Sequence, residues 1–554
     1  MDNQLNVRPL FNNNDAPTLE TYLEKFGVNL EEYKNPIHAV ENYEHYDNIH
    51  NGVAMLRKAI TQCADDINKQ IVIVCDSDCD GYCSTTLAVQ FLLSEGLAHN
   101  NIKVLFHTKK QHGLSADIMA QLNELDLNNI VLMWLPDAGT NDADQCMYLT
   151  MKGISVLITD HHEQSVVNNF ATIINNQTSL HVENKNLCGA GVTHKLVTAY
   201  CNRYGSDFHQ HCIDIVALAT ISDVMDMRSL ENRMIVKWGI KHMNNNFLRG
   251  LCAIMIQDGI ITPTSLAWNV VPKINAVCRS DNQKLKKRMF FAFVSGKDYS
   301  QIQGLFNETK MKSVVGDMIK MHETQRNNAN KLYESAIQNG FKGDKVKIFS
   351  TEDTPYTGLV AMKLSSHYNC PCMVVHDSGN NLMGSLRSPC DMRTKLRDSG
   401  LMKICEGHEA SCGVGWHKKN TNDLNAYCNN LELTPNPKDV IMSTDNVFID
   451  NNVFNIAQQG AEYWGTGIPE PLNHFKDILI NGQDIKTLGR NKTTIKFLYG
   501  DIELIAFFVS KDKRESLHVG EDIDMRLEIL GTPSINTFKG KDTKQIIIKE
   551  WEIE

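Results

Sequence analysis

One stretch constrains the fold more than any other, a short apolar run that ends in three alternating aspartates. Residues 71–75 read Ile-Val-Ile-Val-Cys, and such a run is typical of a strand buried on both faces. Asp76, Asp78 and Asp80 follow at alternate positions, and Gly81 comes next. Three carboxylates this close together repel one another unless a cation lies among them, and hard divalent cations prefer oxygen ligands. The stretch therefore predicts a buried strand that leads into a metal site.

Two other interpretations of this stretch were weighed. An exposed acidic turn would carry the same residues without any ligand, and this alternative stays open for the motif taken alone. A helix-loop-helix calcium site also begins Asp-x-Asp-x-Asp-Gly, but it needs a preceding helix and a glutamate at its twelfth position. Here a strand precedes the motif and the twelfth position is Leu87, so the calcium loop is excluded.

Length and composition place the chain among ordinary globular proteins. Its 554 residues are enough for roughly three to four domains. We expect no membrane span, because no run approaches about eighteen apolar residues, and no secretory signal, because the first residues are neither basic nor apolar. The sixteen cysteines are scattered, which favours reduced thiols and a cytoplasmic location. The net charge of −10 disfavours a protein that coats nucleic acid non-specifically.

From about residue 68 to residue 240, short apolar strands alternate with helical patterns. Strands are predicted at 71–75, 102–107, 129–135, 154–159 and 171–174, and helices at 83–95, 115–123, 189–202 and 209–221. Alternation of this kind predicts an α/β fold with a largely parallel sheet. In such sheets, ligands bind at the carboxyl ends of the strands.

Polar residues gather where these elements end. Asp137 follows one strand, Asp160, His161 and His162 follow the next, and Asp223 follows an apolar helical run. A lone His-His pair is usually structural, and a lone Asp after a strand is often a helix cap. Four separate segments that deliver carboxylates or imidazoles to one edge of a sheet are much harder to explain in that way. We therefore expect one shared site.

The composition of this site points to particular chemistry. Carboxylates with imidazole suit Mn²⁺ or Mg²⁺, and their number exceeds what one ion needs. Two divalent cations with Asp137 as the bridging ligand are the natural solution, and such a pair activates water for phosphoryl displacement. We expect His161 to bind metal directly, His162 to donate to a phosphate oxygen and Asp160 to orient an imidazole.

The motifs Asp-x-Asp-x-Asp-Gly, Asp-x-Gly, Asp-His-His and Ser-Asp, in this order, resemble the DHH phosphoesterase superfamily. Further segments are similar to those of RecJ-type exonucleases. They are residues 175–177, 187–192, 231–233, 272–279, 384–388, 407–413 and 463–471. The resemblance covers about residues 65–554 and is specific, because many independent short motifs fall in register.

The resemblance implies an activity and a domain order. The activity is that of a two-metal exonuclease that degrades single-stranded DNA from 5′ to 3′ into 5′-mononucleotides, in DNA repair, recombination or replication. Implied partners are single-stranded DNA and a single-strand-binding protein or helicase, and the chain is expected to be a monomer. The implied domains are an N-terminal lead-in (1–65), a DHH catalytic domain (66–240), a helical connector (241–338), a DHH-associated α/β domain (339–436) and an oligonucleotide-binding β-barrel (437–554).

The resemblance also assigns roles to residues. Asp76, Asp78, Asp80, Asp137, His161 and Asp223 are the implied metal ligands, and Asp160, His161, His162 and Asp137 the implied catalytic group. Implied substrate-binding residues are His162, Asn275, Arg279, Ser385, Arg387 and His408. The chain departs from the family pattern at Glu406, where a glycine is usual. It also lacks an arginine expected in the basic segment 107–114, where Lys109 and Lys110 are the available substitutes for holding a 5′-phosphate.

The remaining segments were also interpreted from their own residues. The basic run 284–288 is either a solvated helix face or a wall that guides a DNA backbone. Strands near 345–350, 372–376 and 382–386 predict a second α/β unit. Alternating stretches at 493–499, 502–508, 525–530 and 545–549 predict antiparallel strands of a small barrel.

Two other functions remained as alternatives. A phosphodiesterase of short oligonucleotides or cyclic dinucleotides would use the same site, but that family is usually shorter and lacks the β domain beyond residue 440. A catalytically inactive replication scaffold would keep the fold without the chemistry, and the intact metal-ligand set argues against it.

Overall fold

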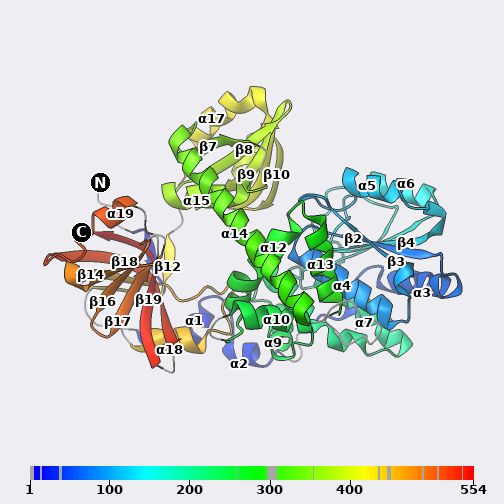
Figure 1. Ribbon diagram of the computed structural model, residues 1–554, viewed down its shortest axis with the longest axis horizontal. Coiled ribbons are helices and arrows are strands. Elements are labelled where there is room, and N and C mark those ends of the chain that lie inside the picture. The colour runs from blue at the N-terminus through cyan, green and yellow to red at the C-terminus, as the bar shows by residue number, and fades with distance from the viewer. Residues whose placement is uncertain are drawn as a thin grey trace. The chain divides into compact units, whose positions relative to one another are not determined.

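The computed structural model describes residues 5–12, 15–36, 40–256, 259–295, 308–352, 355–433, 437–445, 451–489, 492–507, 509, 511–538 and 541–553 (Figure 1). The chain divides into two compact units, Met1–Val315 with Lys438–Glu554 and Gly316–Pro437. The five domains expected from the sequence are a finer division, and their boundaries stay predictions. Within the described residues, no helix combines the length and the apolarity needed to cross a bilayer.

A five-stranded sheet lies at the centre of the N-terminal part. Its strand order is β3-β2-β4-β5-β6, and every neighbouring pair is parallel. The strands are β2 (Gln70–Cys75), β3 (Ile102–Phe106), β4 (Ile130–Pro136), β5 (Ser155–Asp160) and β6 (Thr172–Asn175). The prediction of a parallel sheet is confirmed, and residues 71–75 of β2 are buried as their apolar sequence indicated.

Helices surround this sheet (Figure 1). They are α3 (Ile49–Asp65), α4 (Cys79–Ser94), α5 (Ala116–Asn123), α6 (Ala143–Met151), α7 (Gly189–Tyr204) and α8 (Ile213–Ser222). Helix α4 begins four residues earlier than predicted because the Asp78 side chain accepts a hydrogen bond from the Gly81 amide and caps the helix. Helix α6 was not predicted, and α3, from the predicted lead-in, packs on β4 and β6.

Further helices precede and follow this region in the chain. At the N-terminus lie β1 (Val7–Pro9), α1 (Leu19–Glu24) and α2 (Leu30–Lys34). Helix α9 (Leu230–Lys241) ends where the predicted helical connector (241–338) begins. The connector contains α10 (Asn246–Met255), α11 (Pro263–Ser265), the π-helix η5 (Leu266–Val270), α12 (Val271–Cys278), α13 (Gln283–Ser295) and α14 (Glu308–Asn339), which ends one residue beyond it. Its helical character is therefore confirmed.

The second unit contains a mixed five-stranded sheet of order β10-β11-β9-β8-β7. Its elements are β7 (Lys347–Thr351), α15 (Thr357–Tyr368), β8 (Cys372–Ser378), β9 (Asn381–Arg387), α16 (Arg393–Asp398), β10 (Met402–His408), β11 (Ser411–His417) and α17 (Thr421–Asn430). The three predicted strands are present. Of the segments that carry the resemblance, 384–388 lies mostly on β9 and 407–413 mostly on β10 and β11. Gly384 lets β9 pair closely with β8, because a Cβ there would lie 2.0 Å from the Val374 carbonyl oxygen.

The C-terminal region forms a seven-stranded sheet of order β13-β14-β18-β19-β17-β16-β15. Its elements are β12 (Lys438–Val440), which pairs with β1, β13 (Ser443–Asp445), α18 (Asn451–Gln459), β14 (Asn473–Asn481), β15 (Ile485–Leu488), β16 (Thr494–Tyr499), β17 (Ile502–Ala506), α19 (Lys511–Glu515), β18 (Asp524–Phe538) and β19 (Lys541–Ile553). Strands β14 and β16 also approach each other, so the sheet curls as a barrel requires.

One detail of this sheet differs from the prediction. The pairs β13–β14 and β17–β19 are parallel. The second pair joins stretches 502–508 and 545–549, which were expected to be antiparallel. Strand β18 runs antiparallel to both β14 and β19. Strand β19 lies between β18 and β17 in the sheet and runs in the same direction as β17. Alternating hydrophobicity identifies strands but carries no information about this long connection.

Candidate metal centre

The polar residues singled out in the sequence meet at the carboxyl edge of the parallel sheet. Asp76 follows the last residue of β2, Asp137 follows β4, and Asp160 is the last residue of β5. Asp223 is the C-cap of α8. Because the strands are parallel, their carboxyl ends meet at one edge, and segments far apart in the sequence deliver their side chains to one place.

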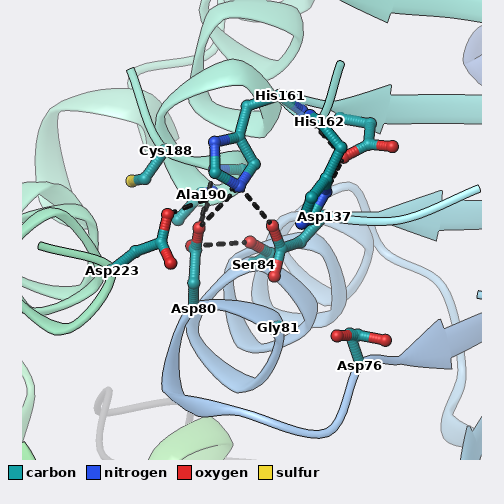
Figure 2. A network of polar contacts seen from close by, with 12 residues as sticks. Asp76, Asp80, Gly81, Ser84, Asp137, His161, His162, Cys188, Ala190 and Asp223 are labelled. Carbon is teal, nitrogen blue, oxygen red and sulfur yellow. Dashed lines mark hydrogen bonds and ion pairs between the residues drawn. The ribbon is translucent and has the colours of Figure 1, made fainter. Parts of the chain in front are cut away.

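His161 lies at the centre of three carboxylates (Figure 2). Its Nε2 atom is 3.3 Å from Asp137 Oδ1, 3.4 Å from Asp223 Oδ2 and 3.9 Å from Asp80 Oδ2. Only 11% of the His161 side chain is exposed. Burial, together with the charge of His162, lowers the pKa of His161 to about 3, so its imidazole is neutral. A neutral imidazole nitrogen facing carboxylate oxygens is a suitable metal ligand.

Three overlapping groups among the described residues have the geometry to hold a metal ion. In each group the potential ligand atoms lie within 4.8 Å of one another. The groups are Asp80, His161 and Asp223; Asp76, Asp78 and Asp137; and Asp137, His161 and His162. Asp137 joins the second and third groups, which is the arrangement expected of a residue shared between two ions.

The donor atoms fit Mn²⁺ or Mg²⁺. All are carboxylate oxygens or imidazole nitrogens, the ligands that these cations accept. Within the described part of the chain, the buried Asp137 Oδ1 has no hydrogen-bond partner. A buried carboxylate oxygen without a donor is costly, and a cation would remove that cost.

The backbone at Asp137 lies close to the end of β5 on one side and to the start of α7 on the other. Asp137 has a φ of 69°, a left-handed conformation that costs energy for any residue with a Cβ. The Asp137 amide donates to the Thr159 carbonyl across the strand ends, at 2.7 Å. On the other side, a Cβ at Gly189 would lie 2.2 Å from Asp137 Oδ1, so only glycine fits at the start of α7.

Asp80 is held by the first amides of α7. Its two carboxylate oxygens accept hydrogen bonds from Gly189 N at 2.7 Å and Ala190 N at 2.9 Å. Burial and the neighbouring Asp78 nevertheless raise the pKa of Asp80. Burial and nearby carboxylates likewise raise the pKa of Asp137 and Asp223 well above the ordinary range. The centre therefore concentrates more negative charge than its hydrogen bonds balance, which is the electrostatic condition for binding cations.

Asp160 has a different role from these ligands. Its carboxylate accepts hydrogen bonds from the amide and hydroxyl of Thr140, from the amides of His161 and His162, and from His162 Nδ1 at 2.7 Å. Burial opposes its charge, but His162 and His161 hold the pKa of Asp160 well below its usual range. Burial would also keep His162 neutral, yet Asp160 raises the pKa of His162 to about 10. Asp160 is thus hydrogen-bonded to the imidazole of His162, whose pKa it raises.

Asp76 makes a second contact of this kind, which the sequence did not reveal. His112 Nδ1 lies 2.6 Å from Asp76 Oδ2, and the Gly113 amide donates to Asp76 Oδ1 at 3.2 Å. His107 Nε2 lies 3.6 Å from the same Oδ1. Burial opposes the charge of Asp76, but His112 and His107 hold its pKa below the ordinary range, and Asp76 in turn raises the pKa of His112. In the sequence, only the basic character of segment 107–114 indicated that this segment could contact an aspartate of the motif.

Two of the expected substrate-binding residues lie beside the centre. Asn275 in α12 accepts a hydrogen bond from the Cys79 amide at 3.0 Å and so contacts the first turn of α4. Arg279 is the C-cap of α12. Its positive charge opposes, but does not cancel, the rise in the pKa of Asp223 that burial and the neighbouring carboxylates cause. Among the described residues, the buried Arg279 Nε has no hydrogen-bond partner. Lys109 and Lys110 are exposed in the turn after β3.

The other expected substrate-binding residues belong to the second unit. Ser385 and Arg387 lie on β9, next to the first turn of α15. Ser385 Oγ is 3.0 Å from Thr357 Oγ1, and a Cβ at Gly358 would lie 3.1 Å from Arg387 Nη2. The structure therefore brings a hydroxyl, a guanidinium and a helix N-terminus together. The backbone of His408 ends β10, but its side chain lies outside the described residues.

Comparison with known proteins identifies two parts of the chain. The family profile "DHH family, N-terminal domain" matches residues 70–220, and "RecJ OB domain" matches residues 447–550. Residues 70–220 are thus similar to the N-terminal domain of the DHH family, and residues 447–550 to the RecJ OB domain. The first match contains the sheet, Asp76 to His162 and the start of α7, and Asp223 follows three residues beyond it. The second contains most of the seven-stranded sheet.

Several known proteins are similar to this chain over most of its length. A Bacillus subtilis strain 168 protein named as the SPbeta prophage-derived single-strand DNA-specific exonuclease YorK is 27% identical over 537 residues, which cover 92% of this chain and 91% of that protein. The single-stranded-DNA-specific exonuclease RecJ of Haemophilus influenzae is 24% identical, with 87% of each chain covered. The structure of RecJ in complex with Mn²⁺ from Thermus thermophilus shares the fold, with a TM-score of 0.72, 18% identity and coverage of 99% of this chain and 78% of that one.

Proposed function

We propose that this chain is a metal-dependent exonuclease that hydrolyses single-stranded DNA from the 5′ end and releases 5′-mononucleotides. The observation that carries the proposal is the pair of ligand groups that meet at Asp137, with His161 on one side and Asp76 and Asp78 on the other. The names of the relatives, which include single-strand DNA-specific exonucleases, support this substrate. The RecJ OB domain supports it too, because such folds bind single strands.

Each group at the centre has a task in this reaction. When bound, two Mn²⁺ or Mg²⁺ ions supply an activated water and positive charge for an in-line phosphoryl displacement. Asp137 would hold both ions, with His161, Asp80 and Asp223 on one side and Asp76 and Asp78 on the other. His162, oriented by Asp160, would donate from Nε2 to a phosphate oxygen. Arg279 would pair with the same phosphate through its guanidinium.

Other parts of the chain would hold the rest of the strand. Ser385, Arg387 and His408 of the second unit would bind backbone phosphates, and Lys109 and Lys110 would contact the 5′ end. The five domains expected from the sequence would carry these tasks in order. The protein would act as a monomer in the cytoplasm, in DNA repair, recombination or replication, beside a single-strand-binding protein or helicase.

The direct test compares single-stranded DNA labelled at the 5′ end with the same strand labelled at the 3′ end, in Mn²⁺ and in EDTA. We expect labelled mononucleotide to appear at once from the 5′-labelled strand and only late from the 3′-labelled strand. A duplex and a cyclic dinucleotide serve as controls and should remain intact. Release in EDTA, or release from the 3′ end first, would contradict the proposal.

A further inference from the structure

Two carboxylate–imidazole pairs of the same design flank the candidate metal centre. Asp160 Oδ1 lies 2.7 Å from His162 Nδ1, and Asp76 Oδ2 lies 2.6 Å from His112 Nδ1. In each pair the carboxylate is almost fully buried, with 1% of its side chain exposed, whereas the His162 and His112 side chains are 50% and 55% exposed. Each imidazole is therefore anchored through Nδ1 on a buried carboxylate, while about half of its side chain is exposed.

The two imidazoles also lie close to each other. Their ring centres are 6.4 Å apart, with an angle of 61° between the ring planes. His162 is in turn 4.5 Å from the ring of His161, and it belongs to one of the candidate ligand groups. A row of three imidazoles thus leads from the metal centre to the protein surface, and His112 is its outer member.

The segment that carries His112 is fastened to the aspartate motif. Ser77 Oγ donates to the Gln111 carbonyl at 2.6 Å and is 3.0 Å from the Gln111 amide, and the Gly113 amide donates to Asp76. Behind it, the buried Lys286 of α13 donates to the His107 carbonyl at 2.7 Å. Residues 107–113 are therefore held before any substrate arrives, and a contact made by a fixed group loses less entropy on binding.

We infer that His112 is a substrate-contacting residue that, together with His162, grips one backbone phosphate of the DNA strand at the metal centre. The inference rests on the proposed function and adds to it a residue that neither the sequence motifs nor the ligand groups include. It also gives segment 107–114 a phosphate ligand where the expected arginine is absent.

The geometry supports a shared phosphate. A hydrogen bond from nitrogen to oxygen spans about 2.9 Å. Two rings whose centres are 6.4 Å apart are therefore close enough for their Nε2 atoms to contact different oxygens of one phosphate group when both atoms face it. Because a carboxylate holds Nδ1 of each ring, Nε2 is the nitrogen that can contact a phosphate oxygen. The pair offers two separately oriented donors, as an arginine fork does with one group.

Substitutions of His112 separate contact with the substrate from support of Asp76. The amide of His112→Asn reaches the position of Nδ1 and keeps the hydrogen bond to Asp76, but nothing remains at the position of Nε2. The amide of His112→Gln reaches further and replaces the outer donor instead. His99→Ala is the matched control, because His99 is also exposed and precedes β3 at the opposite end of the strand.

We expect His112→Asn to lower kcat/KM on single-stranded DNA by about tenfold to a hundredfold, the usual effect of losing one charge-assisted hydrogen bond. His112→Gln should recover a large part of this loss, and His99→Ala should match the unchanged protein. In EDTA, the Kd for a 3′-fluorescein-labelled single strand, measured by anisotropy, should rise for His112→Asn more than for His112→Gln.

Two results would overturn the inference. Wild-type kcat/KM and Kd in His112→Asn would mean that His112 serves only to hold Asp76. Equal losses in His112→Asn and His112→Gln would mean that the outer nitrogen contacts nothing. If the unchanged protein binds single strands but does not hydrolyse them, the proposed function fails, and the anisotropy comparison still decides the role of His112.

Discussion

Two regions of this molecule bury histidine next to carboxylate, and they differ in how completely the groups are paired. In the C-terminal sheet, His474 is bound on both ring nitrogens, by Ser443 Oγ at 2.8 Å and by Glu528 Oε1 at 2.7 Å. At the edge of the parallel sheet, His161 faces three carboxylates, and Asp137 Oδ1 has no hydrogen donor among the described residues. The first arrangement is complete without a ligand, and the second is not.

This difference separates a structural cluster from a functional one. A paired buried histidine joins β13, β14 and β18 and stabilises the sheet, because losing one partner would leave the other buried and unpaired. Crowded carboxylates raise one another's pKa and destabilise the fold unless a cation is bound. We therefore expect substitutions in the two regions to have opposite effects on activity and on stability.

The largest effect is expected at Asp137. Asp137→Asn should lower kcat on single-stranded DNA on the order of a thousandfold, because the shared ligand supplies several kcal/mol of charge stabilisation in the transition state. Its free energy of unfolding without metal should stay equal or rise, because one repelling carboxylate is removed. Steady-state kinetics and urea unfolding in EDTA measure the two quantities. A variant that is both active and unstable would break the comparison.

The opposite pattern is expected at His474. His474→Ala should lower the free energy of unfolding by about 3–5 kcal/mol, because Glu528 is left buried without its partner. The folded fraction should keep the kcat of the unchanged protein. Urea unfolding and kinetics at a temperature below the transition check this. A selective loss of kcat in a stable variant would mean that the C-terminal cluster takes part in the reaction.

Metal binding should stabilise only one of the two regions. At a Mn²⁺ concentration of about one hundred times the Kd, the unchanged protein should gain about 2.7 kcal/mol for each independent site. Asp137→Asn should gain much less, whereas His474→Ala should gain as much as the unchanged protein. Thermal unfolding is measured with Mn²⁺ and, as the reference, in EDTA without added metal. Equal stabilisation of all three proteins would place the ions elsewhere.

The smallest effect is expected at Ser443. Ser443→Ala removes one hydrogen bond to His474 and should cost about 1 kcal/mol of unfolding free energy, with no change in kcat. Urea unfolding resolves a difference of this size when compared with His474→Ala. A loss as large as that of His474→Ala would show that the hydroxyl, and not the ion pair, maintains the cluster.

Much of the fold could be predicted because the signals are local. Apolar runs gave the five parallel strands, and helical spacing gave α4, α5, α7 and α8, within a few residues at most ends. Helix α6 was missed because it follows the strand-end motif directly. Strands β10 and β11 were not among the strands predicted for the second unit. The prediction that β17 and β19 would be antiparallel was wrong, because pairing depends on the route of the chain between strands, which no local pattern records.

By itself, the sequence determined which residues can reach the site, since the end of each parallel strand must lie at one edge of the sheet. Only the tertiary structure decided which of these carboxylates accept hydrogen bonds and which lack a donor. Asp160 and Asp76 have the same chemistry as Asp137, yet hydrogen bonds from His162 and His112 occupy them, and Asp137 Oδ1 lacks a donor among the described residues. His162 stands two residues after Asp160 in the chain, whereas His112 comes from a segment 36 residues beyond Asp76. Their positions follow from packing, such as the fit of Gly189 against Asp137, and not from any local spacing.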